Sequence, residues 1–337
     1  MEAGRRGDIT CPNRFERKKT VVPWHALLPL FLAGLVFPGC GRHGSPAKEE
    51  AMLHETAAGP FRPYDSTRVI VDSIRMDLNR DGKSEFVVTS YDATMPWDPL
   101  LPARFDRLEI FTLDPRRGGF RSAFVDPVEN GASVSVEDVT KNGMLEIVVR
   151  TDAGGNDPIA STGLAVYGCR SDGSFTVLFV STEGAPEIKD IDGDARPEIL
   201  VTGQYWGVTP HADVLVFTAE IHRFDGEKFV EDNRAYAAYF DAEISRARAE
   251  YERLKSAKVQ RDAEASERLY RAFASLALWV VAKGDLYGLR TLWNNERQML
   301  AARLSQDQFD DLDGLVQDVL GMQQQVRVGP PRRRAFG

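Results

Sequence analysis

The sequence predicts an α+β fold, in which β-strands occupy the first part of the folded chain and helices occupy the last part. Two observations predict this division. An acidic loop followed by a β-branched strand occurs three times between residues 77 and 202. From residue 234 onward, apolar residues recur at every third or fourth position, which is the period of an amphipathic helix. A recurring unit of this kind determines the architecture of the part that contains it.

The N-terminal residues have the composition of an export signal. Basic residues precede a mostly apolar stretch, residues 21–37, which is short and interrupted by proline, so a membrane-spanning helix is disfavoured. The stretch ends at Cys40 in a sequence that resembles the lipobox of bacterial lipoproteins, although Phe37-Pro38 departs from its usual residues. The resemblance implies a signal peptide over 1–39, and lipidation of Cys40 at the start of a flexible tether over 40–60. An ordinary signal peptide and an uncleaved anchor are the alternatives.

Charge and cysteine content limit the classes of partner and of fold. The chain carries 42 Lys and Arg against 50 Asp and Glu, a net charge of −8. An acidic chain repels nucleic acid, so we expect no nucleic-acid partner. The arginines within residues 326–337 are typical of a disordered basic tail. Only one cysteine, Cys169, lies beyond Cys40, so we expect no internal disulfide in the mature chain.

The β part, residues 61–233, divides into three units of the same order. Each unit has an entry strand, the acidic loop, an apolar strand, a longer loop and a hairpin. The entry strands are expected at 69–76, 132–137 and 185–189, and the hairpins turn at Gly118-Gly119, Asp172-Gly173 and Asp225-Gly226. Four strands per unit is the size of a propeller blade.

With their loops and hairpins, the units resemble the FG-GAP/VCBS repeats of integrin-type β-propellers, whose signature is Asp-x-(Asp/Asn)-x-Asp-Gly-x-x-(Asp/Glu). The resemblance covers about half of the chain. It implies calcium in the loops and an adhesive or ligand-binding role. The predicted fold is thus a β-propeller-like array of about three four-stranded blades followed by a helical domain. Because closed propellers have at least four blades, we expect an open array whose edge the helices cover. A degenerate fourth blade and closure through a second molecule are the alternatives.

The acidic loops place oxygen atoms at alternate positions, as a calcium ion requires. The predicted ligands are Asp77, Asn79, Asp81, Lys83 and Glu85 in the first loop, Asp138, Thr140, Asn142 and Glu146 in the second, and Asp190, Asp192, Asp194, Arg196 and Glu198 in the third. Lys83 would act through its backbone carbonyl, and Arg196 holds the same position. Ala195 replaces the turn glycine of the other two loops, at a cost of ~1 kcal/mol. The alternative is a set of ordinary acidic turns.

The loops that follow the apolar strands are the candidate ligand-binding surface. Equivalent positions should bring them to one end of the array, and two of them carry aromatic residues: Tyr91 and Trp97 in the first, Tyr205 and Trp206 in the third. Clustered loop aromatics can bind protein or sugar. Their alternative role is to cover the core.

The helical part, residues 234–325, is expected to contain four helices joined by short connections, so that neighbouring helices are antiparallel. Gly284-Asp285 ends the second helix and caps the third, and the residues from Ser305 to Gln308 form a capping box that opens the fourth.

No motif of an enzyme is evident, because the histidines lack zinc-ligand spacing and the chain has neither a nucleophile elbow nor a phosphate loop. The sequence therefore predicts an exported, lipid-anchored, calcium-binding protein that acts as a binding or assembly module at the bacterial envelope, on the outer membrane or the periplasmic face. Its expected partners are the membrane, through the lipid, and an envelope protein or polysaccharide. An envelope hydrolase that holds polysaccharide, and a structural subunit that docks a partner through its helices, are the alternatives.

Overall fold

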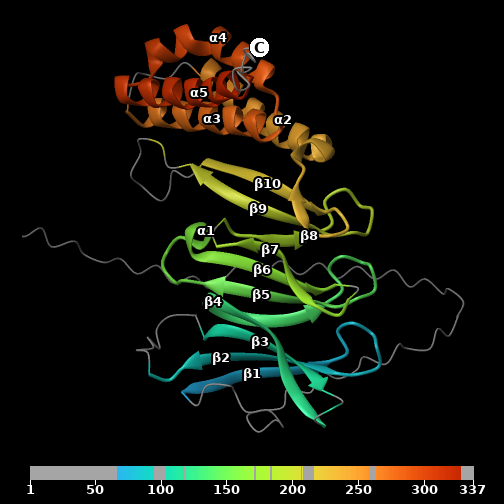
Figure 1. Ribbon diagram of the computed structural model, residues 1–337. Coiled ribbons are helices and arrows are strands. Elements are labelled where there is room, and N and C mark those ends of the chain that lie inside the picture. The colour runs from blue at the N-terminus through green and yellow to red at the C-terminus, as the bar shows by residue number, and fades with distance from the viewer. Residues whose placement is uncertain are drawn as a thin grey trace, which may run out of the picture. The chain divides into compact units, whose positions relative to one another are not determined.

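A computed structural model of the chain describes residues 67–94, 104–114, 116, 118–170, 172–182, 184–205, 207, 216–257 and 263–327. These residues form an α+β fold, with antiparallel sheets followed by helices, which confirms the predicted fold class (Figure 1). All of them belong to one compact unit, residues 51–337. The predicted signal peptide, Cys40, the tether and the tail beyond residue 327 lie outside the described residues.

The strands form a seven-stranded and a four-stranded antiparallel sheet, in which neighbouring strands follow one another along the chain. The first sheet contains β1 (Arg68–Met76), β2 (Glu85–Asp92), β3 (Phe105–Asp114), β4 (Gly119–Glu137), β5 (Glu146–Asp152), β6 (Thr162–Cys169) and β7 (Phe175–Ser181). The second contains β8 (Glu187–Lys189), β9 (Glu198–Tyr205), β10 (Val216–Phe224) and β11 (Phe229–Glu231). A short helix, α1 (Pro158–Ser161), interrupts the connection between β5 and β6.

The three predicted hairpins are present. Leu113 pairs with Phe120 across the first turn, Cys169 with Phe175 across the second, and Phe224 with Phe229 across the third. Glycine supports each turn because it adopts a positive φ without steric cost, as Gly118, Gly173 and Gly226 do. Local turn residues therefore determined these pairings.

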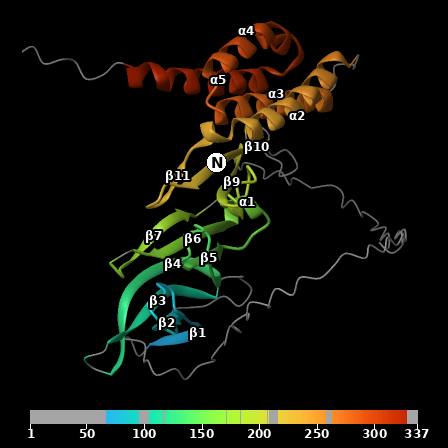
Figure 2. The same ribbon diagram turned by 90° about the vertical axis from the view of Figure 1, so that its right-hand side faces the viewer.

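One strand differs from the prediction of separate four-stranded units. β4 pairs with β3 over residues 119–131 and with β5 over residues 131–137, so it closes the first unit and opens the second. It is long and curved (Figure 2), and its register with β5 shifts between Gly131 and Ser133. Asn130, at a φ of 56°, and Gly131 form a bulge at this point and not a turn. The first two units are consequently one sheet, and the third unit is the second sheet.

The chain changes from strands to helices between Glu231 and Asn233. A 3-10 helix, η2 (Asn233–Tyr236), leads into α2 (Ala237–Ser256), α3 (Ala263–Ala282), α4 (Leu286–Arg303) and α5 (Gln306–Arg327). Their apolar sides enclose a core that includes the fully buried Phe273, Leu289 and Leu312. The predicted cap of α4 is confirmed, since the Gly288 N–H donates to the Asp285 carboxylate at 2.7 Å.

The predicted capping box of α5 is also confirmed. The backbone N–H of Ser305 donates to the Gln308 side chain at 3.2 Å, and the N–H of Gln308 donates back to the Ser305 hydroxyl at 3.4 Å. Among the described residues, no helix combines the length and the apolar composition that crossing a membrane requires.

The apolar strands β2, β5 and β9 pack on both faces, and equivalent residues contact equivalent neighbours. Val87 of β2 and Ile147 of β5 belong to one buried cluster, which joins the first unit to the second. Val148 of β5 and Ile199 of β9 belong to another cluster, which joins the second unit to the third. Leu200 of β9 packs with residues of η2, α2 and α3. The second and third units thus each present one face to the preceding unit and the other face to the following element.

Candidate metal centre

The three acidic loops are equivalent connections between antiparallel strands. The first joins β1 to β2, the second joins β4 to β5, and the third joins β8 to β9. The residues that flank the loops are paired in the same register, Met76 with Glu85, Glu137 with Glu146, and Lys189 with Glu198. Each loop therefore spans the same number of residues, and its positions one to nine can be compared directly.

The ninth-position glutamates turn inward. Glu85, Glu146 and Glu198 are 3%, 1% and 3% exposed. Each accepts a hydrogen bond from the backbone N–H of the second loop residue, at 2.9 Å from Leu78, 2.8 Å from Val139 and 2.9 Å from Ile191. Burial raises the pKa of all three carboxyls above the ordinary value of glutamate. Sequence reasoning assigned these residues as metal ligands and missed this structural role.

The backbone follows the same path through all three loops. The fourth and sixth positions both have a positive φ: 58° and 82° at Arg80 and Gly82, 54° and 87° at Lys141 and Gly143, 81° and 67° at Gly193 and Ala195. The predicted turn at the sixth position is thus present in every loop. In the third loop the glycine stands at the fourth position instead, and alanine occupies the left-handed sixth position.

The third loop brings three carboxylates together. One oxygen atom of each of Asp190, Asp192 and Asp194 lies within 4.8 Å of the others, and all three residues are exposed. Oxygen ligands of a calcium ion lie 2.3–2.6 Å from it and therefore about 3–5 Å from one another, so this spacing fits a single cation. Like charges this close also repel one another when no cation is bound.

Backbone N–H groups hold these three carboxylates in place. Asp190 accepts from Gly193 at 2.7 Å and from Ala195 at 3.0 Å. Asp192 accepts from the N–H of Asp194 at 3.1 Å, and Asp194 accepts from the N–H of Arg196 at 2.7 Å. The second oxygens of Asp192 and Asp194 make no hydrogen bond within the described part of the chain. The carboxylates are therefore oriented before any ion binds, and two oxygens remain for it.

The first loop repeats this arrangement with one neutral member. Asp77 accepts from the N–H groups of Asp81 and Gly82 at 3.1 and 2.9 Å, and the bond from the sixth position is the one that it shares with Asp190 of the third loop. Asn79 takes the place of Asp192 and accepts from Asp81 at 3.0 Å. The ammonium of Lys83 lies 3.7 Å from the Asp81 carboxylate, which lowers the local negative charge. The backbone of the first loop follows the same path as that of the third loop, but the first loop carries less negative charge.

In the second loop, both carboxylate oxygens of Glu146 accept hydrogen bonds from the protein. Glu146 accepts from the N–H groups of Val139 and Thr140, and its second oxygen accepts from the Thr140 hydroxyl at 3.0 Å. Asn142 accepts from the N–H of Met144 at 2.7 Å. One oxygen of Asp138 is buried and has no hydrogen-bond partner among the described residues, the kind of atom that a water or a cation would satisfy.

The candidate ligand loops differ in what they contact. The hydroxyl of Tyr205 donates to Asp311 of α5 at 2.6 Å, and its ring packs against the helical core, so this residue joins sheet to helices. Tyr91 is half-buried at the end of β2. Trp97 and Trp206 lie outside the described residues.

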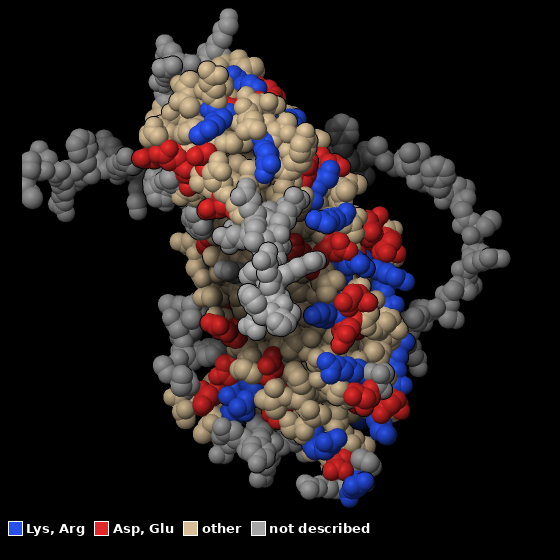
Figure 3. All heavy atoms as spheres, turned by 45° about the horizontal axis from the view of Figure 1, so that its top comes forward, with Lys and Arg blue, Asp and Glu red and all other residues tan. Residues whose placement is uncertain are grey.

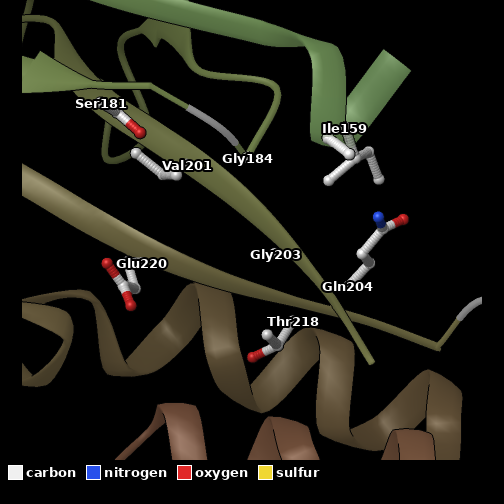
Figure 4. A pocket seen from close by; sticks show the side chains of 9 residues that line it. Ile159, Ser181, Gly184, Val201, Gly203, Gln204, Thr218 and Glu220 are labelled. Atoms are coloured by element: carbon white, nitrogen blue, oxygen red, sulfur yellow. The ribbon is translucent and has the colours of Figure 1, made fainter. Parts of the chain in front are cut away.

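A cleft of about 400 Å³ lies where the second and third of these loops begin (Figure 4). Ile159 of α1 and Gln204 of β9 line one end, and Ser181 and Glu220 lie toward the other. The Gln204 amide donates to Asp157 at 2.6 Å, which ties the two loops together. Glu220 is the only ionisable side chain among its described lining residues, so the cleft suits a neutral or cationic polar group. Sequence reasoning predicted neither α1 nor this contact.

The remaining cysteine and the surface charges indicate no further site. Cys169 is a free, buried cysteine, and burial raises the pKa of its thiol to about 11, which suppresses its reactivity. Acidic and basic side chains are interspersed over the face of the molecule in Figure 3.

No family model matches the chain, and no curated protein and no solved structure is similar to it.

Proposed function

We propose that the chain is an exported, lipid-anchored, calcium-binding β-repeat protein that serves as a binding or assembly module at the bacterial envelope. The observation that carries the metal assignment is the Asp190, Asp192 and Asp194 cluster, set in a loop whose backbone frame occurs three times. These carboxylates would hold the ion together with the carbonyl of Arg196. Carboxylate and carbonyl oxygens are the ligands that calcium prefers.

The first loop is the second proposed calcium site, through Asp77, Asn79 and Asp81, because Asn79 and Asp81 accept the same backbone hydrogen bonds as Asp192 and Asp194 of the third loop. The ion would neutralise crowded carboxylates and fix the connection between two strands. In both loops the buried glutamate supports the frame from the inside.

The finer fold that we propose is a propeller-like array of FG-GAP/VCBS type. Its support is the strand pairing, since each unit has four antiparallel strands when β4 is counted in both the first and the second. The proposed open form is supported by the packing of Leu200, on the last apolar strand, against the helices.

A binding role is supported by the cleft beside Gln204 and Glu220, which opens where two of the loops leave the sheets. Export and anchoring are supported by the sequence of residues 1–40 alone. Replacement of Cys40 by Ser should release the chain from membranes and abolish the mass increment of the lipid. Retention of both would contradict the anchor.

The metal assignment is tested by thermal unfolding of the purified chain in EDTA and then in millimolar calcium. A ligand that binds only the folded state stabilises it by about 2.7 kcal/mol at a hundredfold excess over its Kd, so the melting temperature should rise. Asp190→Ala and Asp192→Ala should reduce the rise, and Asp77→Ala should reduce it further in combination.

Asp318→Ala is the matched control, because Asp318 is an exposed carboxylate of α5, far along the chain from the loops. It should leave the calcium response unchanged. A wild-type melting temperature that calcium does not move would leave ordinary acidic turns as the better interpretation of all three loops.

A further inference from the structure

Clefts lie between both pairs of successive units. The cleft beside Gln204, between the second and third units, has a counterpart of about 450 Å³ between the first and second units. We call the counterpart the first cleft and the cleft beside Gln204 the second cleft. Ala160 of α1 and Ser181 of β7 line both, so the two clefts adjoin and form one groove.

The two clefts are structurally equivalent. Thr151 of β5 lines the first and Gly203 of β9 lines the second, and each is the fifth residue after its loop glutamate. On the opposite wall, Asp126 of β4 lines the first cleft and Ser181 of β7 lines the second. These two residues each pair with the equivalent leucine of the preceding strand. The clefts therefore arise from the repeat itself and lie one unit apart.

The described lining of the groove carries carboxylates and neither lysine nor arginine. Asp126 and Glu129 lie in the first cleft, and Glu220 lies in the second. Glu129 and Glu220 are exposed, and within the described residues neither forms an ion pair with lysine or arginine. One carboxylate oxygen of Glu220 lies 3.4 Å from Nε2 of His222. The groove therefore favours a positively charged ligand.

Each cleft also has an apolar wall. Val180 of β7 lines the first cleft and is 64% exposed, and Ile159 of α1 lines the second. A lysine side chain has an apolar stem and a cationic tip. Its stem could cover the apolar wall while its ammonium group reaches the carboxylate. Each cleft thus has the two features that a lysine side chain requires.

The second cleft also contains an acceptor without a donor. The side-chain oxygen of Gln204 is buried and has no hydrogen-bond partner among the described residues. Its amide nitrogen donates to Asp157 at 2.6 Å, which fixes the orientation of the amide, and the side chain points from β9 toward Ile159 (Figure 4). An ammonium group has three donors and no acceptor, and an extended backbone adds an N–H at each residue. A ligand rich in donors would satisfy this oxygen.

We propose that the groove binds an extended basic segment of a partner protein, with one lysine side chain in each cleft. The inference rests on the binding role proposed above and names the chemistry of the partner. Packed sheets lie about 10 Å apart, and a chain in the polyproline conformation advances about 9 Å in three residues, which brings every third residue to the same side. Lysines three positions apart would therefore reach both clefts. Nucleic acids and acidic polysaccharides would be repelled.

The first test measures binding of a capped, fluorescent peptide of Lys-Pro-Ser repeats to the full chain by fluorescence anisotropy. A neutral peptide with Gln in place of each Lys is the ligand control and should not bind. Glu129→Gln/Glu220→Gln should weaken binding of the lysine peptide by about two- to fivefold for each substitution, the range that exposed ion pairs contribute. Asp126 is left unchanged because it accepts from the Tyr167 hydroxyl at 2.9 Å and so has a structural role.

The matched control variant is Glu137→Gln/Asp318→Asn, which removes the same charge from exposed positions outside the described lining of the groove. It should bind the lysine peptide as the wild type does. Thermal unfolding in EDTA checks that both variants are folded. Equal weakening in the two variants would show only a general attraction to an acidic chain and would overturn the proposal.

The second test locates the peptide. A carbodiimide joins a bound lysine to a neighbouring carboxylate, and mass spectrometry identifies the crosslinked residues. Crosslinks at Glu220, and at Asp126 or Glu129, are the expected result. Crosslinks that fall mainly on the acidic loops or on the helices would overturn the assignment of the groove.

The outcomes separate this inference from the proposed function. A neutral oligosaccharide that binds in a groove-dependent manner, while the lysine peptide does not bind, would overturn the inference and keep the binding role. Binding of neither ligand would overturn the inference and count against the binding role as well. The calcium response is measured independently, so its loss would leave a groove-dependent affinity for the lysine peptide, and with it the inference, in place.

Discussion

Glu198 accepts a 2.9 Å hydrogen bond from the backbone N–H of Ile191, seven residues before it, and does so from a nearly fully buried position. The same bond ties Glu85 to Leu78 and Glu146 to Val139. A carboxylate at the end of each loop therefore closes the loop on itself. The acidic signature in this chain has two parts, outer carboxylates that face solvent and an inner one that fixes the frame.

Removal of the inner carboxylate should destabilise the fold without any metal. Glu146→Leu leaves the N–H groups of Val139 and Thr140 without their acceptor, and an orphaned buried donor costs about 1–3 kcal/mol. Glu146→Gln keeps an accepting oxygen and should lose less. Urea unfolding in EDTA measures both. Glu137→Leu, at an exposed site on the neighbouring strand, is the control, and an equal loss there would argue against a special role for Glu146.

Replacement of Ala195, whose backbone is left-handed, by glycine should stabilise the third loop. Ala195 has a φ of 67°, at a position that glycine occupies in the other two loops. Left-handed backbone costs an alanine about 1–2 kcal/mol, and the freedom of glycine in the unfolded chain offsets part of this, so Ala195→Gly should gain about 0.5–1 kcal/mol. Gly82→Ala is the mirror variant and should lose a similar amount. Thermal unfolding measures both changes, and a loss in Ala195→Gly would contradict the argument.

Local residues predicted much of this fold. The hairpins depend on turns such as Asp172-Gly173, and the start of α5 depends on the reciprocal bonds between Ser305 and Gln308, so both could be derived from neighbouring residues. At Asn130-Gly131, local residues alone are a poor guide to the structure. The pair is typical of a turn, yet pairing with β3 on one side and with β5 on the other holds it within one strand as a bulge.

Contacts between distant residues account for what sequence reasoning missed at the candidate site. The inward turn of Glu85 depends on the burial of the strand that it begins, which is a property of packing and not of the loop. Tyr205 was a candidate for ligand binding because it is aromatic and follows an apolar strand. Its partner Asp311 lies 106 residues away on α5, and no local pattern connects the two.

The contact between the second and third ligand loops should depend on pH. A hydrogen bond from Gln204, and further bonds from the N–H groups of Ile159 and Ala160, lower the pKa of Asp157 in the folded chain. The unfolded chain then binds the proton more tightly, so this contribution to stability is present above pH ~3.9 and is lost as the pH falls through the lower folded value.

Asp157→Asn removes the charge and keeps the size of the side chain. The wild type should therefore melt above this variant at pH 7, and the difference should shrink at pH 3. In the Gln204→Ala background, the Asp157→Asn substitution should lower the melting temperature at pH 7 by a smaller amount. Scanning calorimetry at the two pH values checks this, and a difference that is the same at both would place its origin elsewhere.

The carboxylate of Asp311 should be a main tie between the sheet and the helices. Tyr205 of β9 and Tyr270 of α3 both donate their hydroxyls to the same Asp311 oxygen, each at 2.6 Å. Asp311→Ala leaves the hydroxyls of the half-buried Tyr205 and the buried Tyr270 without this acceptor and should cost about 1–3 kcal/mol. Tyr205→Phe removes one donor and should cost less. In the Asp311→Ala background it should cost less still, because the bond to Asp311 is already lost and only the contact between the Tyr205 and Tyr270 hydroxyls remains.

Asp310→Ala is the matched control for this tie, because Asp310 is the preceding residue of the same helix, is exposed and contacts only the Gln306 side chain through its carboxylate within the described residues. Urea unfolding of the four variants measures the coupling between Tyr205 and Asp311. Additive losses would show that the two residues act independently. A coupling close to the full effect of Tyr205→Phe would instead identify this hydrogen bond as the means by which α5 holds the last sheet in register with the helices.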